Sequence, residues 1–165
     1  MIGRLCLALL LAVAPLPAAE PIRVLVFTTT DCPISNRYAP EIQRLATKFR
    51  GKAQFVLVYP VAADSPAMIR DHVRKFAYSI DVIRDVDQKL VKQTGVTVTP
   101  EVAVMRGAQL LYRGRIDDRY VELGRERPSP TTRDLDAAIE AALAGQPITT
   151  RETRAVGCML ADLIK

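Results

Sequence analysis

The sequence is poor in the residues that build metal sites and disulfide scaffolds. It has three cysteines and one histidine in 165 residues, and their spacing matches no zinc-binding pattern. Cys6 lies in an N-terminal segment discussed next, which leaves Cys32 and Cys158 in the rest of the chain. Two cysteines do not make a disulfide-rich framework, so we expect at least one of them to be reactive. No cofactor is predicted, and a copper site formed by these two cysteines with His72 is the one metal alternative.

Long apolar runs are also scarce. Residues 1–19 contain a basic residue, Arg4, an apolar stretch at 5–13 that is too short to span a bilayer, and a region of small residues. This pattern is typical of a secretory signal peptide cut after Ala18 or Ala19, and it predicts a periplasmic or secreted protein. The alternative is a buried or anchoring N-terminal helix. Since no later run is long enough to cross a membrane, we expect no membrane anchor after cleavage.

Aromatic residues are few, at 5% of the chain, and the net charge of +5 is scattered. The arginines between residues 113 and 127 alternate with Asp117 and Asp118, which indicates a solvated loop. A nucleic-acid-binding surface would need interleaved aromatic residues and a recognisable motif, so no nucleic-acid partner is expected. His72 has charged neighbours along its predicted helix and is therefore expected to be exposed.

Residues 20–147 are predicted to form one α/β domain, followed by a tail, residues 148–165, that carries Cys158. Apolar β-branched runs predict strands, and apolar residues that recur every three or four positions predict helices. We expect strands at 22–28, 53–59, 82–83, 102–105 and 110–116. We expect helices at 33–50 with a kink at Pro40, at 66–77, from Asp85 or Asp87 to Gly95, and at 135–144. A polar loop is expected at 117–130, with Thr131 or Thr132 as the cap of the last helix. A βαβ half followed by a ββα half predicts a central mixed sheet.

The most informative segment is Asp31-Cys32-Pro33-Ile34-Ser35, just after the first predicted strand. Cys32 lies where a helix begins, so its sulfur faces unpaired N–H groups and the positive end of the helix dipole. Both favour the thiolate, which makes Cys32 the candidate nucleophile. Asp31 opposes the thiolate by its charge and has two interpretations, a proton acceptor or a helix cap. Ser35, one helical turn further on, has two interpretations, a hydrogen-bond donor to the thiolate or an ordinary residue of the helix.

Three features resemble the thioredoxin-like superfamily over residues 22–145. The family's Cys-x-x-Cys and Ala-Pro are similar to Cys32-Pro33-Ile34-Ser35 and Ala39-Pro40. Its Gly-Val and Thr-Pro are similar to Gly95-Val96 and Thr99-Pro100. Its hairpin glycines fall at Gly107 and Gly114. The resemblance implies a thioredoxin-like fold with a cis bond before Pro100. It also implies that Thr99 and Pro100 bind substrate, by presenting a backbone edge near Cys32 that pairs with an extended segment.

Two departures from the family pattern change the expected chemistry. Asp31 replaces the usual aromatic residue, and Ser35 replaces the second cysteine. A dithiol cycle within the motif is therefore excluded, which leaves either a monothiol site or a site whose partner cysteine comes from elsewhere. If the tail folds back, Cys158 is expected to resolve a mixed disulfide or a sulfenic acid on Cys32. If the two lie far apart, Cys158 is expected to pair with another chain or a metal, or to be packed in the tail.

The motif also resembles bacterial exported redoxins related to the alkyl hydroperoxide reductase and thiol-specific antioxidant group. This resemblance implies that Thr29 hydrogen-bonds a peroxide and that Arg113 or Arg115 stands near the thiolate to bind substrate. The alternative for these arginines is an ordinary solvated position at a strand end.

The preferred function is an exported thiol–disulfide oxidoreductase in which Cys32 attacks a disulfide of a protein or small molecule. One alternative is a thiol peroxidase in which Cys32 is oxidised to a sulfenic acid. The other is a thioredoxin-like binding or metal-handling module, because a fold alone does not decide among these functions.

Overall fold

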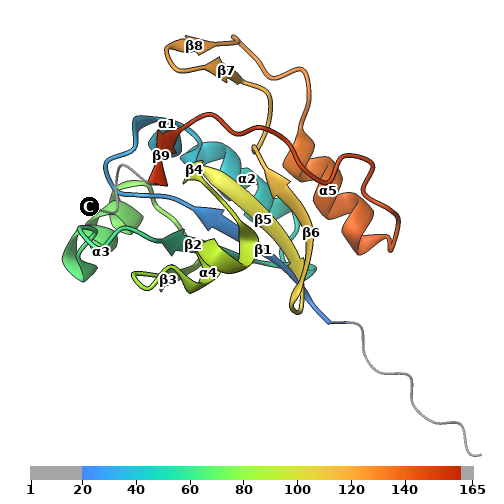
Figure 1. Ribbon diagram of the computed structural model, residues 1–165, viewed down its shortest axis with the longest axis horizontal. Helices are drawn as coiled ribbons and strands as arrows, with labels where there is room; N and C mark the ends of the chain where they lie inside the picture. The colour runs from blue at the N-terminus through green and yellow to red at the C-terminus, as the bar shows by residue number, and fades with distance from the viewer. Residues whose placement is uncertain (1–19, 161–165) are drawn as a thin grey trace, which may run out of the picture.

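The computed structural model describes residues 20–160 (Figure 1). The predicted signal peptide at residues 1–19 and the last five residues of the predicted tail lie outside this range. Within it, no helix has the length and apolar character needed to cross a membrane.

The central sheet has five strands in the order β3-β2-β1-β5-β6. The strands are β1 (Ile22–Phe27), β2 (Ala53–Tyr59), β3 (Asp81–Arg84), β5 (Glu101–Arg106) and β6 (Gln109–Gly114). β1, β2 and β3 run parallel, whereas β5 is antiparallel to both β1 and β6. The predicted mixed sheet and thioredoxin-like fold are thereby confirmed.

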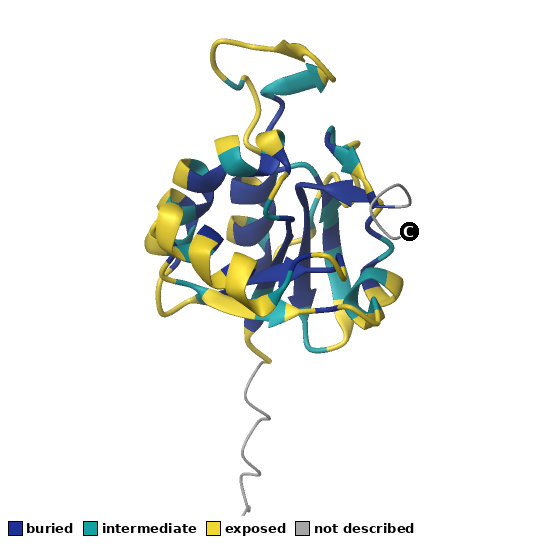
Figure 2. Ribbon diagram, turned by 90° about the vertical axis from the view of Figure 1, so that its left-hand side faces the viewer, coloured by how far each residue is buried: buried dark blue, intermediate teal, exposed yellow. Residues whose placement is uncertain are grey.

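Helices cover both faces of the sheet, as strands with two buried faces require. The helices are α1 (Pro33–Arg37), α2 (Ala39–Lys48), α3 (Pro66–Lys75), α4 (Lys89–Thr94) and α5 (Asp134–Leu143). One core cluster joins Val24 and Val26 of β1 to buried residues of α2, α3 and α5. The alternate β1 residues, Leu25 and Phe27, belong to a second cluster against which α4 packs. Figure 2 shows these buried layers on both sides of the sheet.

The helix predicted at 33–50 is two helices, α1 and α2, separated at Tyr38. Pro40 lies in the first turn of α2, where its missing N–H costs no helical hydrogen bond, so the chain restarts a helix instead of bending one. Gly95 ends α4 in the left-handed conformation, with φ 71°, as a helix-terminating glycine is expected to do.

Two predictions beyond residue 116 were wrong. The polar loop contains a small hairpin, β7 (Tyr120–Glu122) and β8 (Arg125–Glu126), which projects from the body of the molecule (Figure 1). Neither predicted threonine caps α5, whose N-cap is Arg133 without a side-chain hydrogen bond. Thr131 and Thr132 instead donate their backbone N–H groups to Asp118, at 2.6 and 2.9 Å.

The tail returns to the domain. Residues 151–153 run parallel to β6, with Arg113 N–H donating to the Arg151 carbonyl at 2.9 Å and Thr153 N–H donating to the Arg113 carbonyl at 3.1 Å. The chain then forms β9 (Cys158–Met159), which pairs antiparallel with β4 (Val98–Thr99) in a separate two-stranded sheet. The tail thus brings Cys158 to the loop that precedes Pro100.

Candidate active site

Cys32 is the N-cap of α1, and four residues, 28–31, separate it from the carboxyl end of β1. Its Sγ accepts the backbone N–H of Ser35 at 3.5 Å, so the cysteine does for α1 what a serine or aspartate does for other helices. The side chain is only 1% exposed. Asp31 is exposed and is not the cap, which removes one of its two interpretations.

The loop before Pro100 lies against the same sulfur. The Thr99–Pro100 peptide bond is cis, and the Cys32 thiol donates to the Thr99 carbonyl oxygen at 3.1 Å. Thr99 is fully buried. The structure therefore brings Thr99 and Pro100 to Cys32, although 67 residues separate Thr99 from it in the sequence.

Cys158 completes a sulfur pair. Its Sγ lies 3.0 Å from Sγ of Cys32, and its thiol donates to that atom. Both cysteines are free, Cys32 buried and Cys158 partly exposed. The register of the two-stranded sheet places Cys158 directly opposite Thr99, so β4 holds one cysteine by a backbone carbonyl and the other by strand pairing.

The two sulfurs differ in acidity. Burial would raise the pKa of Cys32, but hydrogen bonds from Ser35 and Cys158 outweigh it and leave this pKa below its ordinary value. For Cys158, burial together with the hydrogen bond to Cys32 and its negative charge raises the pKa to about 12. Cys32 is therefore the first sulfur of the pair to ionise, while Cys158 keeps its proton. This is the arrangement of a nucleophile beside a second thiol.

Ser35 and Thr29 lie in the immediate surroundings of Cys32. The Ser35 hydroxyl is buried and has no oxygen or nitrogen partner within the described part of the chain, which leaves it free for the thiolate. Thr29 is buried, and its carbonyl accepts the Cys32 N–H at 3.4 Å. Both residues thus shape the start of α1, and Ser35 is the one that bonds to the sulfur.

The arginines expected near the thiolate are bonded elsewhere. Arg115 Nε donates to a carboxylate oxygen of Asp134 at 2.8 Å, at the start of α5. Arg113 forms an ion pair with Glu152 of the tail and donates to the Gly95 carbonyl at 2.6 Å. Neither guanidinium is bonded to a sulfur of the pair. Arg113 instead fastens the tail to the domain.

His72 was predicted to be exposed, and this was wrong, because it is only 5% exposed. Its Nε2 lies 2.7 Å from Oδ1 of Asn36, which can only accept, and its Nδ1 lies 2.8 Å from the Tyr59 hydroxyl. Burial lowers the pKa of His72 and so favours the neutral ring, in which Nδ1 accepts from Tyr59. Asn36 in turn donates to the Thr30 carbonyl at 3.2 Å. The network ties α3 and β2 to α1, the helix that Cys32 caps.

Sequence reasoning missed this network, yet a signal was present. Ile69, His72 and Phe76 are spaced three and four residues apart, so they share one face of α3. Ile69 is buried, and Phe76 packs partly buried against the same core. Among residues 20–160 no three His, Cys, Asp or Glu side chains form a group able to hold a metal ion.

The comparisons with known proteins agree with this fold. A family model described as thioredoxin-like matches residues 21–109, more than half of the chain. The chain belongs to this thioredoxin-like family. A search of curated proteins finds no match.

Solved structures share the fold. An uncharacterized conserved protein from Geobacillus kaustophilus has a TM-score of 0.74 at 24% identity, covering 86% of this chain and 77% of that one. A hypothetical protein from Sinorhizobium meliloti 1021 has a TM-score of 0.73 at 23% identity, with 86% and 79% covered. A secreted Mycobacterium tuberculosis disulfide oxidoreductase homologous to E. coli DsbE has a TM-score of 0.53 at 19% identity, with 73% and 81% covered.

Proposed function

We propose that this protein is an exported thiol–disulfide oxidoreductase whose redox pair is Cys32 and Cys158. The observation that carries the proposal is the 3.0 Å contact between the two sulfurs, with the lowered pKa on Cys32 and the raised pKa on Cys158. The second cysteine, which the family pattern places three residues after the first, comes here from the tail.

The reaction proceeds in two exchanges. The Cys32 thiolate attacks one sulfur of a substrate disulfide, a bond forms between them, and the other substrate sulfur leaves as a thiolate, which accepts the Cys158 proton when that thiol reacts in the second exchange. Cys158 then attacks Sγ of Cys32, closes the Cys32–Cys158 disulfide and releases the second substrate thiolate. The substrate gains two electrons and the protein loses them, so the reverse sequence oxidises a dithiol.

The remaining site residues have supporting roles. Ser35 stabilises the Cys32 thiolate through its N–H, and its hydroxyl also lowers the pKa of Cys32. Thr99 and Pro100 form a backbone edge that contacts both cysteines, because the Thr99 carbonyl accepts the Cys32 thiol and Thr99 pairs with Cys158. Thr29 fixes the turn before Cys32. Asp31, exposed and next to Cys32 in the chain, is the proposed acceptor of a proton from a substrate thiol. Arg115 has no role in this proposal, because Asp134 engages it.

The thiol peroxidase alternative is less well supported. Its chemistry calls for a cation beside the thiolate, and Arg113 of β6 and Arg115 just after it are both paired with carboxylates and bonded to neither sulfur. Export rests on the signal-like segment at residues 1–19, and the secreted disulfide oxidoreductase among the structural neighbours is compatible with it. The expected substrate is a protein or small-molecule disulfide or thiol.

Mixing the reduced protein with a protein disulfide such as insulin tests the proposal. We expect loss of two hydrogens from the protein by mass spectrometry, with peptide mapping that joins Cys32 to Cys158. Peroxide consumption without disulfide reduction would instead establish the peroxidase, and inertness of Cys32 toward both oxidants would establish the binding module.

A further inference from the structure

The tail contacts β4 at two positions, one on each side of Cys158. Leu160 is 3% exposed and belongs to the core cluster that contains Phe27, Val96 and Met105. Its N–H donates to the Thr97 carbonyl at 2.9 Å, which continues the pairing of β9 with β4. An apolar side chain two residues after the cysteine is therefore part of how this segment binds.

Gly157, immediately before the cysteine, is required for a different reason. A Cβ at this position would overlap the Thr99 carbonyl oxygen and lie 2.6 Å from the Thr99 carbonyl carbon. The backbone of Gly157 is outside the positive-φ region in which glycine is preferred. The glycine thus serves close approach of two backbones, and any side chain would push the cysteine away from Cys32.

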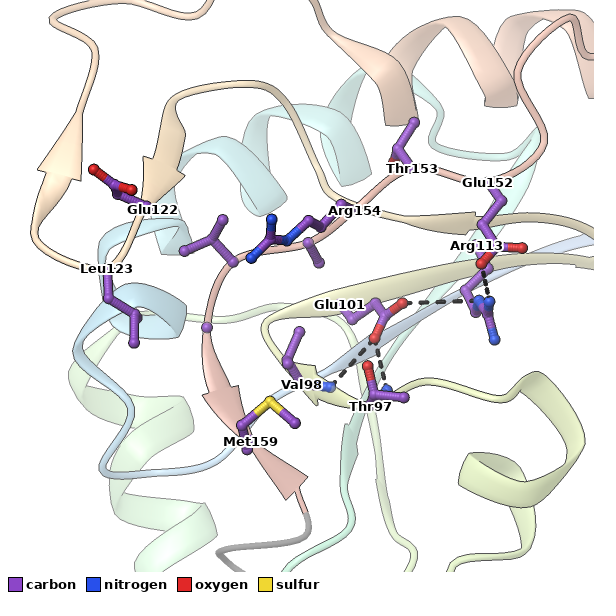
Figure 3. A pocket seen from close by; sticks show the side chains of 13 residues that line it. Thr97, Val98, Glu101, Arg113, Glu122, Leu123, Glu152, Thr153, Arg154 and Met159 are labelled. Atoms are coloured by element: carbon purple, nitrogen blue, oxygen red, sulfur yellow. Dashed lines mark hydrogen bonds and ion pairs between the residues drawn. The ribbon is translucent and has the colours of Figure 1, made fainter.

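A partner polypeptide that pairs with the loop before Pro100 would use this same β4 edge. β9 occupies it, and Cys32 beneath is only 1% exposed. Residues 151–153 hold the tail to β6, whereas residues 154–156 belong to no helix or strand. They line a groove of about 550 Å³ that separates them from β4 and the β7–β8 hairpin, bordered by Val98, Leu123 and Met159 (Figure 3). β9 is therefore attached through a short span with open space beside it.

We propose that β9 is an internal substitute for the partner segment, so that the β4 edge selects extended polypeptides with the pattern glycine, cysteine, any residue, apolar residue. This inference rests on the proposed function and adds its substrate class. The partner segment displaces β9, pairs with Val98 and Thr99, and presents its sulfur to Cys32 where Cys158 had been. β9 competes with it for the same backbone groups, since each can accept only one strand.

Peptide disulfides test the pattern. The peptide Arg-Ala-Val-Gly-Cys-Met-Leu, its cysteine joined to a chromogenic aromatic thiol, is compared with versions carrying valine for glycine or aspartate for leucine. The Cys32 thiolate attacks the peptide sulfur, the bond to the aromatic sulfur breaks, and the coloured thiolate leaves. Each rate is divided by the rate of glutathione with the same peptide, which corrects for intrinsic reactivity.

All chains carry Cys6→Ser and Cys158→Ser, so that Cys32 is the only thiol. One chain keeps β9 in place, a second adds Gly157→Val and a third adds Leu160→Asp, which unseat β9 in two independent ways. Far-UV circular dichroism and thermal unfolding check that the domain remains folded. We expect both unseated chains to react with the glycine peptide about tenfold faster or more, and to prefer it over each altered peptide by about tenfold or more.

Equal rates for the three peptides would overturn the pattern. Equal rates for the seated and unseated chains would overturn the competition. In either case a small aromatic disulfide that still reacts with Cys32 would leave the oxidoreductase proposal intact. If no disulfide reacts with Cys32 in any chain, the proposed function itself fails.

Discussion

The two cysteines of the site belong to regions that are held in place in different ways. Cys32 caps a helix just beyond β1, whose residues Val24, Val26 and Phe27 are completely buried between two core clusters. Cys158 lies on a two-residue strand at the end of a tail, paired only with β4 within the described residues. The fold therefore fixes the proposed nucleophile, while a small number of separable contacts fix its proposed partner, as expected for a sulfur that substrate displaces.

The largest expected effect distinguishes the two sulfurs by their order of action. Cys32→Ser should reduce disulfide reduction by roughly 10³-fold or more, because a serine hydroxyl is not ionised near neutral pH. Cys158→Ser should keep the first exchange and stop the second, so a mixed disulfide between Cys32 and substrate accumulates. Non-reducing electrophoresis and mass spectrometry measure the adduct.

The informative control is Cys6→Ser, which removes the third thiol of the chain without touching the described site. It should reduce disulfides at the parent rate. A mixed disulfide on Cys158 in the Cys32→Ser protein would reverse the assignment of nucleophile and partner.

The second effect concerns acidity. Because the Cys158 thiol donates to Sγ of Cys32 and lowers the pKa of Cys32, Cys158→Ala should raise that pKa, whereas Cys158→Ser retains a donor and should raise it less. Below the pKa of Cys32, the fraction of thiolate sets the alkylation rate, so loss of one such hydrogen bond should slow alkylation by roughly 3- to 10-fold. Iodoacetamide alkylation followed against pH gives the midpoint. Identical profiles for Ala and Ser variants would show that the tail does not tune Cys32.

The third effect tests the attachment of the tail. Thr153 Oγ1 accepts the Arg115 N–H at 3.0 Å and bonds to the Tyr112 hydroxyl at 2.7 Å. Thr153→Val removes both bonds, and at about 1 kcal/mol this should slow closure of the Cys32–Cys158 disulfide roughly fivefold. Thr150→Val is the matched control, since Thr150 is exposed on the same tail. Stopped-flow oxidation by a small disulfide measures closure, and equal effects of both variants would contradict the role of Thr153.

The difference between the two regions also explains what the sequence could predict. The strands of the central sheet and the Cys32 turn follow from local patterns, such as the apolar run at 22–28 and Pro33 at the helix start. The position of Cys158 follows from contacts that carry no periodicity, such as Gly157 against Thr99 and Thr153 beside Tyr112. Proximity of the two cysteines was therefore only one of the alternatives that the sequence left open.

The sequence also could not predict which side chains bond to one another. Arg115 could be placed at a strand end from the sequence, but its neighbour Asp134 comes from a helix 19 residues later, and local patterns do not specify which carboxylate a guanidinium meets. Likewise the charged neighbours of His72 suggested an exposed helix face, although its spacing from Ile69 placed it on the buried one.

The smallest expected effect concerns His72, in the network that ties α3 and β2 to α1, the helix that Cys32 caps. Burial lowers the pKa of His72, so the unfolded chain binds a proton at a higher pH than the folded one does. The stabilisation is complete above the unfolded pKa of about 6.5 and is lost as the pH falls below it, at no more than about 1.4 kcal/mol per pH unit. The free energy of unfolding, measured with urea, should therefore rise between pH 5 and 8 for the parent. It should rise less for His72→Gln, whose side chain does not titrate. Since His72 bonds to Asn36 and Tyr59 but to neither sulfur, alkylation of Cys32 should change less than about twofold. A parallel loss of Cys32 reactivity would show that the network behind α1 positions the nucleophile as well as stabilising the fold.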